Sequence, residues 1–330
     1  MATILDVARE SGVSKSTVSL VLRGSLLIRA EKRERVLAAA KRIGYRPNLG
    51  ARRLKGGRSG TIGVIIPNLS NPFFSEMMDG VESVLGQANT MALLGASHES
   101  LETEAELMER MSDRGVDALI LVPCRRQGEY YRNFQTEKRI PIVTASRNPP
   151  GSGADAVVPD NERGGYEIGL RAAETGRAIY FIRSTGQNIT VMERLRGFRR
   201  ALQERGLSFQ LHRGGRALTV ECGILAAESF PEKNIPAVVF APNDMVAFGF
   251  MKGLLARKLR VPEDVAVYGF DGLELFRLGL FDLGGMKVDA QQIGRRAAEL
   301  LLKRLTSGQI LPEKPEIEML IPVFQTGQTI

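Results

Sequence analysis

A group of hydrogen-bonding side chains stands close to the amino end of the chain, at Lys15, Ser16 and Thr17. They follow one another where the sequence pattern predicts the first turn of a helix. Amine and hydroxyl groups in that position can reach DNA phosphates and base edges when the helix enters a major groove. An ordinary pair of packed helices explains the same residues, so by themselves they leave both interpretations open.

Two short helices joined by a tight turn are expected to position these side chains. Thr3 followed three residues later by Asp6 is typical of a helix start. Gly12 can adopt the left-handed conformation that ends a helix, and Ser14 can cap the next one. A third helix is expected over residues 30–43. The three helices would close over a small apolar core made of Ile4, Val7, Val18, Val21, Val36 and Leu37.

The charge of the chain is concentrated near its amino end. Residues 1–58 carry 14 Lys and Arg against 4 Asp and Glu, whereas the remaining residues carry 31 basic and 33 acidic side chains. The net charge of +8 therefore belongs to the first sixth of the chain. This distribution is typical of a nucleic-acid-binding domain attached to a neutral body.

Several other classes of protein and site find little support in the sequence. Cys124 and Cys222 lie far apart, and we expect both to be free thiols in a reducing compartment. His98 and His212 have no metal-ligand spacing, so neither a metal site nor a Ser–His–Asp triad is expected. The chain contains no 18-residue apolar run, signal peptide or lipidation motif, which argues against a membrane and for the cytoplasm.

From Thr61 onward, apolar strands alternate with helices in two successive rounds. This pattern predicts parallel sheets covered on both faces, arranged as two doubly wound lobes. Helices are expected over residues 75–88, 102–114 and 193–205. Strands are expected over residues 61–67, 91–96, 117–122, 141–145 and 155–158, then 178–182, 209–211, 237–241 and 265–270.

Several motifs occur in the order and spacing of one known family. They are the runs DVARESGVSKSTVSLVL, RERVLAAAKRIGYRPN, ARRL and IGVIIPNLSNPFF, followed by VPDN at 158–161, ERLRGF at 193–198, NDMVA at 243–247 and GFD at 269–271. Through them the chain resembles the lac/galactose repressor family of bacterial transcription factors over almost its whole length. The resemblance implies a helix-turn-helix domain over residues 1–45, a hinge helix and linker over 46–60, and a two-lobed sensor of periplasmic-binding-protein type over 61–330.

The resemblance also implies which residues meet DNA. The second helix would read bases in the major groove, and Leu54 would wedge into a central base step from the minor groove. Leu20 stands where many members carry Arg, so a guanine contact is lost there. Arg29 stands where a Ser or Thr usually caps the third helix. The expected DNA-contacting residues are Thr3, Ser14, Lys15, Ser16, Thr17, Ser19, Leu20, Arg29, Tyr45, Asn48, Ala51 and Leu54.

The effector is expected in the cleft between the lobes, beside residues that follow strands. A mixture of carboxylates, amides and arginine there suits a ligand with several hydroxyls. The expected effector-binding residues are Asn71, Phe73, Phe74, Ser146, Arg147, Asp160, Asn188, Thr190, Arg194, Asn243 and Asp271. Asp160 has an alternative role, because it could simply cap the helix that begins at Asn161.

Two departures from the family pattern bear on the effector. Leu218 falls where many members place an aromatic residue that stacks on the ligand, and Ser146 replaces a frequent Asp. If Arg147, Arg183 and Arg194 all faced the cleft, an anionic effector such as a sugar acid or sugar phosphate would be favoured.

These expectations describe a homodimeric regulator, not an enzyme, that binds a near-palindromic double-stranded DNA operator and needs no cofactor. A repressor of carbohydrate uptake or catabolism, controlled by a sugar or sugar derivative, is the favoured function. Because residues 321–330 show no heptad, a dimer is favoured over a tetramer. The alternative is a periplasmic-type solute-binding protein, which would share the sensor fold but carry a signal peptide and no basic domain.

Overall fold

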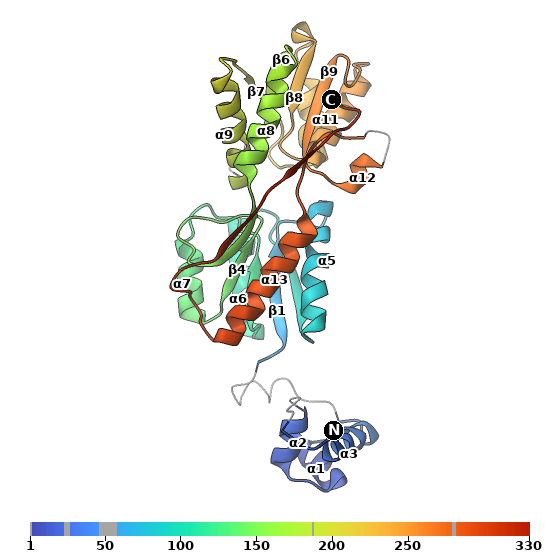
Figure 1. The fold of residues 1–330 in the computed structure, drawn as a ribbon, viewed down its shortest axis with the longest axis vertical. Coiled ribbons are helices and arrows are strands. Elements are labelled where there is room, and N and C mark those ends of the chain that lie inside the picture. Colours follow the sequence, from blue (N-terminus) through green and yellow to red (C-terminus); the bar gives the residue numbers. More distant parts are fainter. Residues whose placement is uncertain (1, 23–26, 46–57, 187, 279–281) are drawn as a thin grey trace. The chain divides into compact units, whose positions relative to one another are not determined.

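The computed structural model describes residues 2–22, 27–45, 58–186, 188–278 and 282–330 (Figure 1). The chain divides into two compact units, Met1–Ser59 and Gly60–Ile330. Each unit has hydrophobic core residues of its own.

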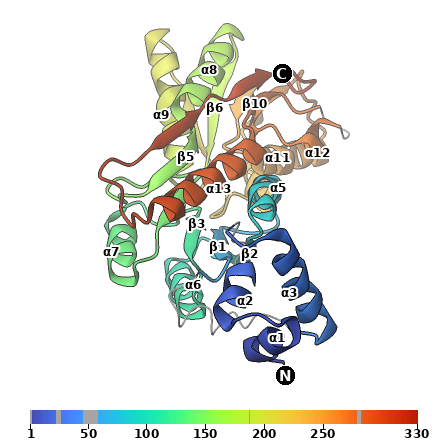
Figure 2. The same cartoon turned by 60° about the horizontal axis from the view of Figure 1, so that its bottom comes forward.

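Three helices form the described part of the first unit, namely α1 (Ile4–Ser11), α2 (Lys15–Leu22) and α3 (Ala30–Arg42) (Figure 2). The expected start of α1 is confirmed, because Thr3 N donates to Asp6 Oδ2 at 2.9 Å and Asp6 N donates to Thr3 Oγ1 at 3.4 Å. Gly12 ends α1 with a φ of 65°, in the left-handed region. The Ser14 hydroxyl then accepts from Thr17 N at 3.2 Å and caps α2.

The core of the first unit is small and made mostly of valine and alanine. Its fully buried members are Val7, Val18, Val21, Val36, Ala39 and Ala40. The expectation that Leu37 joins this core is wrong, since that side chain is 49% exposed. The buried positions of α3 fall at the i, i+3 and i+4 spacing, which places the next residue after Val36 on the outer side.

The first lobe of the second unit is a six-stranded parallel sheet in the order β11-β5-β4-β3-β1-β2. Its strands are β1 (Thr61–Ile66), β2 (Met91–Ala96), β3 (Ala118–Leu121), β4 (Ile142–Ala145), β5 (Asp155–Pro159) and β11 (Ile317–Leu320). The helices are α5 (Pro72–Gln87), α6 (Leu101–Arg114), α7 (Glu129–Lys138) and α13 (Ala290–Ser307). Figures 1 and 2 both place α13 alongside α5.

The second lobe repeats this topology in the order β12-β10-β9-β8-β6-β7, with only β12 antiparallel to its neighbour. Its strands are β6 (Ala178–Arg183), β7 (Gln210–Arg213), β8 (Ala237–Phe240), β9 (Val265–Asp271), β10 (Gly285–Lys287) and β12 (Val323–Gln325). The helices are α8 (Asn161–Glu174), α9 (Ile189–Glu204), α10 (Val220–Glu228), α11 (Asp244–Ala256), α12 (Glu274–Arg277) and the 3₁₀ turn η1 (Glu232–Asn234). Two doubly wound lobes are therefore confirmed.

Both faces of these sheets are covered, as the apolar strands predict. In β1, Ile62, Val64 and Ile66 belong to the core cluster that includes Met77 of α5, whereas Ile65 belongs to a second cluster on the opposite face. Alternate residues of a strand point to opposite faces, so a strand buried on both sides must be apolar throughout.

Some expected boundaries differ from the observed ones. The helix expected from residue 75 begins at Pro72, and the one expected from residue 193 begins at Ile189. In both cases an Asn side chain caps the helix earlier than the apolar periodicity suggests. The strand expected over residues 209–211 is Gln210–Arg213.

The described chain passes between the lobes at three points: from β5 to α8, from β10 to α13, and from β11 to β12. Strands next to the crossings therefore end where the two lobes meet (Figure 1). In such sheets ligands bind at the carboxyl ends of the strands.

Candidate DNA-reading helix and effector cleft

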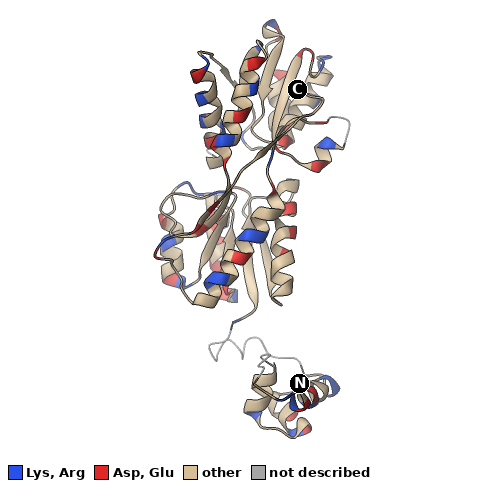
Figure 3. Ribbon diagram, in the orientation of Figure 1, with Lys and Arg blue, Asp and Glu red and all other residues tan. Residues whose placement is uncertain are grey.

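Helix α2 buries one side and exposes hydrogen-bonding groups on the other. Val18 is fully buried in the core of the first unit, whereas Ser14, Lys15 and Ser16 are exposed. Leu20 is 38% exposed, which makes it an apolar group on an otherwise polar outer face. Lys and Arg residues also occur along α3 (Figure 3). Helix α2 therefore presents hydrogen-bond donors, hydrogen-bond acceptors and the isobutyl group of Leu20 to solvent.

The hydroxyl groups at the start of α2 are held relative to one another. Ser14 Oγ lies 2.8 Å from Ser16 Oγ and 2.9 Å from Thr17 Oγ1. Thr17 and Ser19 are half-buried, so their side chains are less accessible than those of Lys15 and Ser16. A set of hydroxyls ordered before binding loses less side-chain entropy when it meets a base edge or phosphate.

The other expected DNA-contacting residues take different positions. Thr3 caps α1, and Arg29 stands at the start of α3 without a side-chain capping bond. Tyr45 is half-buried against the core of the first unit. The remaining three, Asn48, Ala51 and Leu54, lie outside the described residues, as does most of the expected hinge.

An inner cavity of about 80 Å³ lies between the lobes of the second unit. Ten of the eleven expected effector-binding residues line it, and the exception is Asp160. The lining consists of Asn68, Asn71, Phe73, Phe74, Glu99, Ser146, Arg147, Asn188, Thr190, Arg194, Ala217, Leu218, Thr219, Asn243 and Asp271.

Three helices begin at this cavity, and an asparagine caps each of them. The side-chain oxygens of Asn71, Asn188 and Asn243 accept from backbone N–H groups in the first turns of α5, α9 and α11, at 3.1, 3.0 and 2.9 Å. The caps fix the orientation of each amide. The positive ends of three helix dipoles consequently meet at the cavity, where they favour oxygen-rich or anionic groups.

Arg194 is 4% exposed, and all three nitrogens of its guanidinium donate hydrogen bonds. Its Nε donates to Asn161 Oδ1 at 2.9 Å, and its Nη1 donates to the Pro242 carbonyl oxygen at 2.5 Å. Its Nη2 donates to Asp271 Oδ1 at 3.3 Å, and the guanidinium lies 3.6 Å from the centre of the Phe270 ring. These contacts hold the guanidinium in one orientation.

Asp271 and Asp244 form a buried acidic pair beside Arg194. Burial raises the pKa of both carboxyls, and the charge of Asp271 raises the pKa of Asp244 further. The Arg194 guanidinium opposes this rise for Asp271. Asp244 Oδ2 accepts from Leu273 N at 2.7 Å, and Asp271 has a left-handed φ of 123°. Strain and buried charge of this kind collect at ligand sites.

Arg147 is the second buried guanidinium, at 6% exposed. Its Nη1 and Nη2 donate to the two carboxylate oxygens of Glu99 at 2.8 and 2.6 Å, and Nη1 also donates to the Pro123 carbonyl oxygen at 3.0 Å. This parallel pair of charge-assisted bonds is a strong geometry for arginine and a carboxylate.

Two expectations about the cleft need correction. Asp160 caps α8 through a bond from Arg163 N to Oδ1 at 3.0 Å and lines a separate hollow, so the alternative role foreseen for it is the observed one. Arg183 is exposed at the end of β6 and lines neither cleft cavity. Of the three arginines considered from the sequence, Arg147 and Arg194 line the inner cavity, and each is paired with a carboxylate.

A larger outer cavity of about 730 Å³ adjoins the inner one. Both are lined by Glu99, Arg147 and Asn188, whereas Ser184 and Arg216 line only the outer cavity. Sequence reasoning missed Glu99, although it follows strand β2 just as the expected residues follow theirs. It also missed Ser184 and Arg216, although Arg183 and Leu218 nearby were both considered in relation to the effector.

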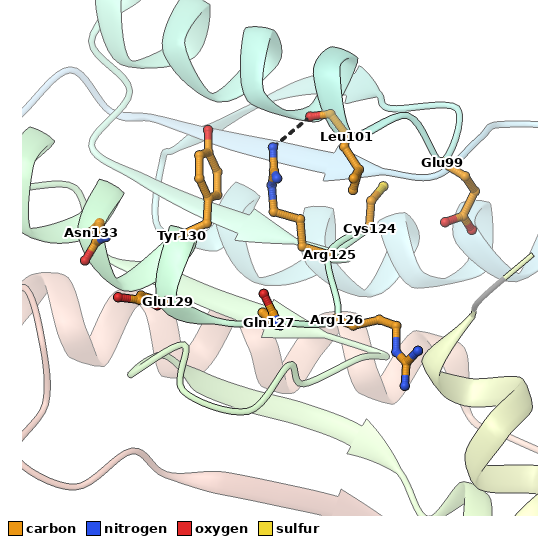
Figure 4. Close-up of a pocket in the computed structure, with 9 residues that line it drawn as sticks. All are labelled: Glu99, Leu101, Cys124, Arg125, Arg126, Gln127, Glu129, Tyr130 and Asn133. Carbon is orange, nitrogen blue, oxygen red and sulfur yellow. Dashed lines mark hydrogen bonds between the residues drawn. The ribbon is translucent and has the colours of Figure 1, made fainter.

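A third hollow of about 990 Å³ lies wholly on the first lobe (Figure 4). There Arg125 lies over the Tyr130 ring at 4.1 Å and donates to the Leu101 carbonyl oxygen at 3.2 Å. The side chain of Cys124 reaches its edge, and burial raises the pKa of this thiol to about 12. This hollow shares Glu99 and Cys124 with the outer cavity but is not lined by the buried Arg147, Arg194, Asn243 or Asp271, so we place the candidate effector site in the cleft.

Metal and membrane sites find no support in the described part of the chain. No cluster of three or more His, Cys, Asp or Glu there could hold a metal ion. Within the same residues, no helix combines the length and apolar character needed to cross a bilayer.

Comparisons with known proteins identify the family of both parts of the chain. Residues 3–48 match the family model for bacterial regulatory proteins of the lacI family, and residues 59–325 match that for periplasmic binding proteins and the sugar-binding domain of the LacI family. The chain is 31% identical over 311 residues to the HTH-type transcriptional repressor PurR of Vibrio vulnificus, covering 92% of each chain.

Solved structures of transcriptional regulators are also similar to this chain. The transcriptional regulator CelR in complex with cellobiose is similar over 100% of both chains, with a TM-score of 0.71 and 25% identity. A LacI family regulator from Enterococcus faecium with bound ribose is similar over 82% of this chain and 98% of that one, with a TM-score of 0.73 and 25% identity.

Proposed function

Because the chain belongs to the LacI family of bacterial regulatory proteins, and is thus a DNA-binding transcriptional regulator, we propose that it represses genes of carbohydrate uptake or catabolism. In this proposal a homodimer binds a near-palindromic operator, and a small sugar-like effector in the cleft controls that binding. The observation that carries the proposal is the pairing, in one chain, of an exposed polar recognition helix with a sensor whose buried polar groups converge on a cavity.

We place the DNA contacts of the first unit on α2. Lys15 and Ser16 project from its first turn, and Leu20 from the same side one turn later. One such helix reads only a few base pairs, so two copies related by a two-fold axis are needed for a site of useful length. Residues 46–60 serve as hinge and linker in this proposal, by resemblance to the family, with Leu54 as the minor-groove wedge.

The effector is assigned to the cleft on the chemistry of its lining. Asp271, Asn243, Asn188 and Thr190 offer carboxylate, amide and hydroxyl groups within one cavity. Such a set discriminates hydroxyl positions on a sugar ring better than it would hold an apolar ligand. The relatives bound to cellobiose and ribose are consistent with this assignment.

For effector binding to control DNA binding, the sensor must be able to adopt two arrangements of its lobes. Three chain segments connect the lobes, so a change in lobe closure can occur by rotation about them. A ligand that contacts both lobes favours one arrangement by its difference in affinity for the two, and a few kcal/mol is sufficient.

An electrophoretic mobility shift with the promoter DNA upstream of the protein's own gene tests the proposal. We expect the full chain to retard this fragment in the presence of excess nonspecific DNA, and a chain lacking residues 1–58 to leave it unshifted. Equal retardation by both chains, or none by the full chain at sub-micromolar concentration, would contradict it. A solute-binding protein without a regulatory role predicts no retardation at all.

A further inference from the structure

The inner cavity alone is too small for an effector of ordinary size. Its volume is about 80 Å³, whereas small-molecule sites are typically about 300–1,000 Å³. The adjoining outer cavity has about 730 Å³, and the Glu99–Arg147 ion pair lines both. A ligand that occupies the inner cavity must therefore extend past this ion pair into the outer one.

Glu99 holds Arg147 in the manner expected of a ligand carboxylate. Both of its oxygens accept from the guanidinium, yet its side chain is 43% exposed and can move toward solvent. Its backbone is in the left-handed region with a φ of 57°, next to His98 with a φ of 52°. Two successive non-glycine residues in this region are strained, and strain of this kind is typical of functional loops.

Two groups from the second lobe complete the outer cavity. Ser184 is 2% exposed, and its buried hydroxyl has no hydrogen-bond partner among the described residues. A buried hydroxyl without a hydrogen-bond partner is unfavourable, and a ligand that bonds to it removes that penalty. Arg216 is exposed at the wall of the same cavity and makes no ion pair within the described part of the chain. Among the described residues, the Ser184 hydroxyl has no hydrogen-bond partner and Arg216 forms no ion pair, and a hydroxyl donor beside such a guanidinium suits an anion.

We propose that the effector carries a carboxylate or phosphate group, and that this group replaces the Glu99 carboxylate on Arg147 and is also bound by Arg216 and the Ser184 hydroxyl. This inference rests on the proposed function of the cleft and narrows its ligand to sugar acids or sugar phosphates. The residues that select the anion are Arg147 and Arg216, whereas Arg194 remains paired with Asp271.

Charge balance explains why the exchange requires an anion. When Glu99 leaves, Arg147 remains buried and needs a negative partner, because an unpaired buried charge is strongly unfavourable. An incoming carboxylate or phosphate supplies that partner, so the exchange is close to neutral in charge. A neutral sugar cannot supply that partner, so it gains nothing by displacing Glu99 and binds beside an intact Glu99–Arg147 pair.

The first test removes the Glu99 carboxylate, which competes with the ligand anion for Arg147. Glu99→Gln leaves Arg147 without its carboxylate, whereas Glu106→Gln makes the same charge change at an exposed position of α6 that lines neither cavity. Thermal unfolding is measured in sodium acetate and sodium phosphate against sodium chloride at equal ionic strength. We expect a larger anion-dependent rise in Tm for Glu99→Gln than for wild type or Glu106→Gln. Equal rises in all three proteins would overturn the proposal.

The second test uses matched ligands. Titrations with glucuronate, galacturonate, gluconate and glucose 6-phosphate are compared with glucose and galactose. We expect at least one acid or phosphate to bind more tightly than its neutral counterpart, and to bind Glu99→Gln about tenfold more tightly than wild type because the competing state is gone. The uronate and phosphate arms distinguish the two sources of the anion. A panel in which no anionic compound exceeds its neutral counterpart would count against the inference.

Two further variants locate the anion. Arg216→Gln should weaken binding of the preferred anionic compound about tenfold and Ser184→Ala about threefold, each leaving neutral sugars unaffected. Arg213→Gln is the matched control for Arg216→Gln, since Arg213 is exposed on β7 and lines neither cavity. Unchanged anion binding in both cavity variants would refute the placement. Promoter retardation by the wild type is measured in parallel, and its absence counts against the proposed function, whereas these outcomes concern the ligand alone.

Discussion

The Asp244→Asn substitution should stabilise the second unit above neutral pH. Asp244 is 3% exposed and lies beside Asp271, so burial and a like charge both raise its pKa above the usual range. Its Oδ2 accepts from Leu273 N at 2.7 Å, and an asparagine oxygen can keep that bond. The substitution therefore removes an ionisable group without removing the hydrogen bond that holds the loop.

The sign of the pH dependence follows from the raised pKa. Between the unfolded and folded pKa values, the folded protein binds more protons at this site than the unfolded protein does, so the site's contribution to stability falls as pH rises through that window. One pKa unit corresponds to about 1.4 kcal/mol. Because the pKa of Asp244 is raised to about 8, the wild type should be less stable than the variant by several kcal/mol at pH 8, and the difference should shrink toward pH 5.

Urea unfolding followed by circular dichroism at pH 5, 6, 7 and 8 measures this difference for the second unit. Asp264→Asn is a suitable control, because Asp264 pairs with Arg260 at the surface and its pKa is lowered, not raised. If Asp244→Asn proved less stable than wild type at pH 8, the ionised carboxylate would be needed for folding. The account of a buried, destabilising charge would then be refuted.

Three further predictions concern packing, base recognition and the effector. Gly197→Ala should destabilise the second unit by about 2–4 kcal/mol in urea unfolding, because a methyl group there would overlap the Glu162 carbonyl oxygen where α9 crosses α8; a change below about 0.5 kcal/mol would contradict this close packing. Leu20→Arg should move the selected operator toward guanine at one position of each half-site, as read by in vitro selection, whereas an unchanged motif would mean that this side chain does not face the bases. Asp271→Ala should weaken the effector about 10- to 100-fold in calorimetry while promoter DNA binding without effector persists, and equal effector binding by both proteins would remove Asp271 from the site.

The sequence predicted the secondary structure and the two-lobed fold well because both depend on local patterns. Apolar runs identified the buried strands, and the Thr3 and Ser14 caps identified the turn between the first helices. Boundaries were less accurate where capping overrode periodicity. Asn188 caps α9, which therefore begins at Ile189, four residues before the expected Glu193. Leu37 was misplaced because a face of α3 rich in alanine leaves the apolar stripe ambiguous.

The composition of the cleft was predictable only in part. Residues that follow strands were identified by rule, and most of them line the inner cavity. The pairing of Arg147 with Glu99 was not predictable, because it joins positions 48 residues apart through the positions of two loops. Whether an arginine forms an ion pair depends on which residues the fold brings next to it. The ion pairs of Arg147 and Arg194 determine which residues can select an anion.

In vitro selection of genomic DNA fragments tests the central claim most directly. The full chain should enrich a near-palindromic motif with two half-sites, and Lys15→Ala together with Ser16→Ala should weaken or change the half-site sequence because these side chains lie at the exposed start of α2. A motif recovered equally well by a chain lacking residues 1–58, or no enrichment over random fragments at 150 mM salt, would contradict the assignment of DNA recognition to this helix.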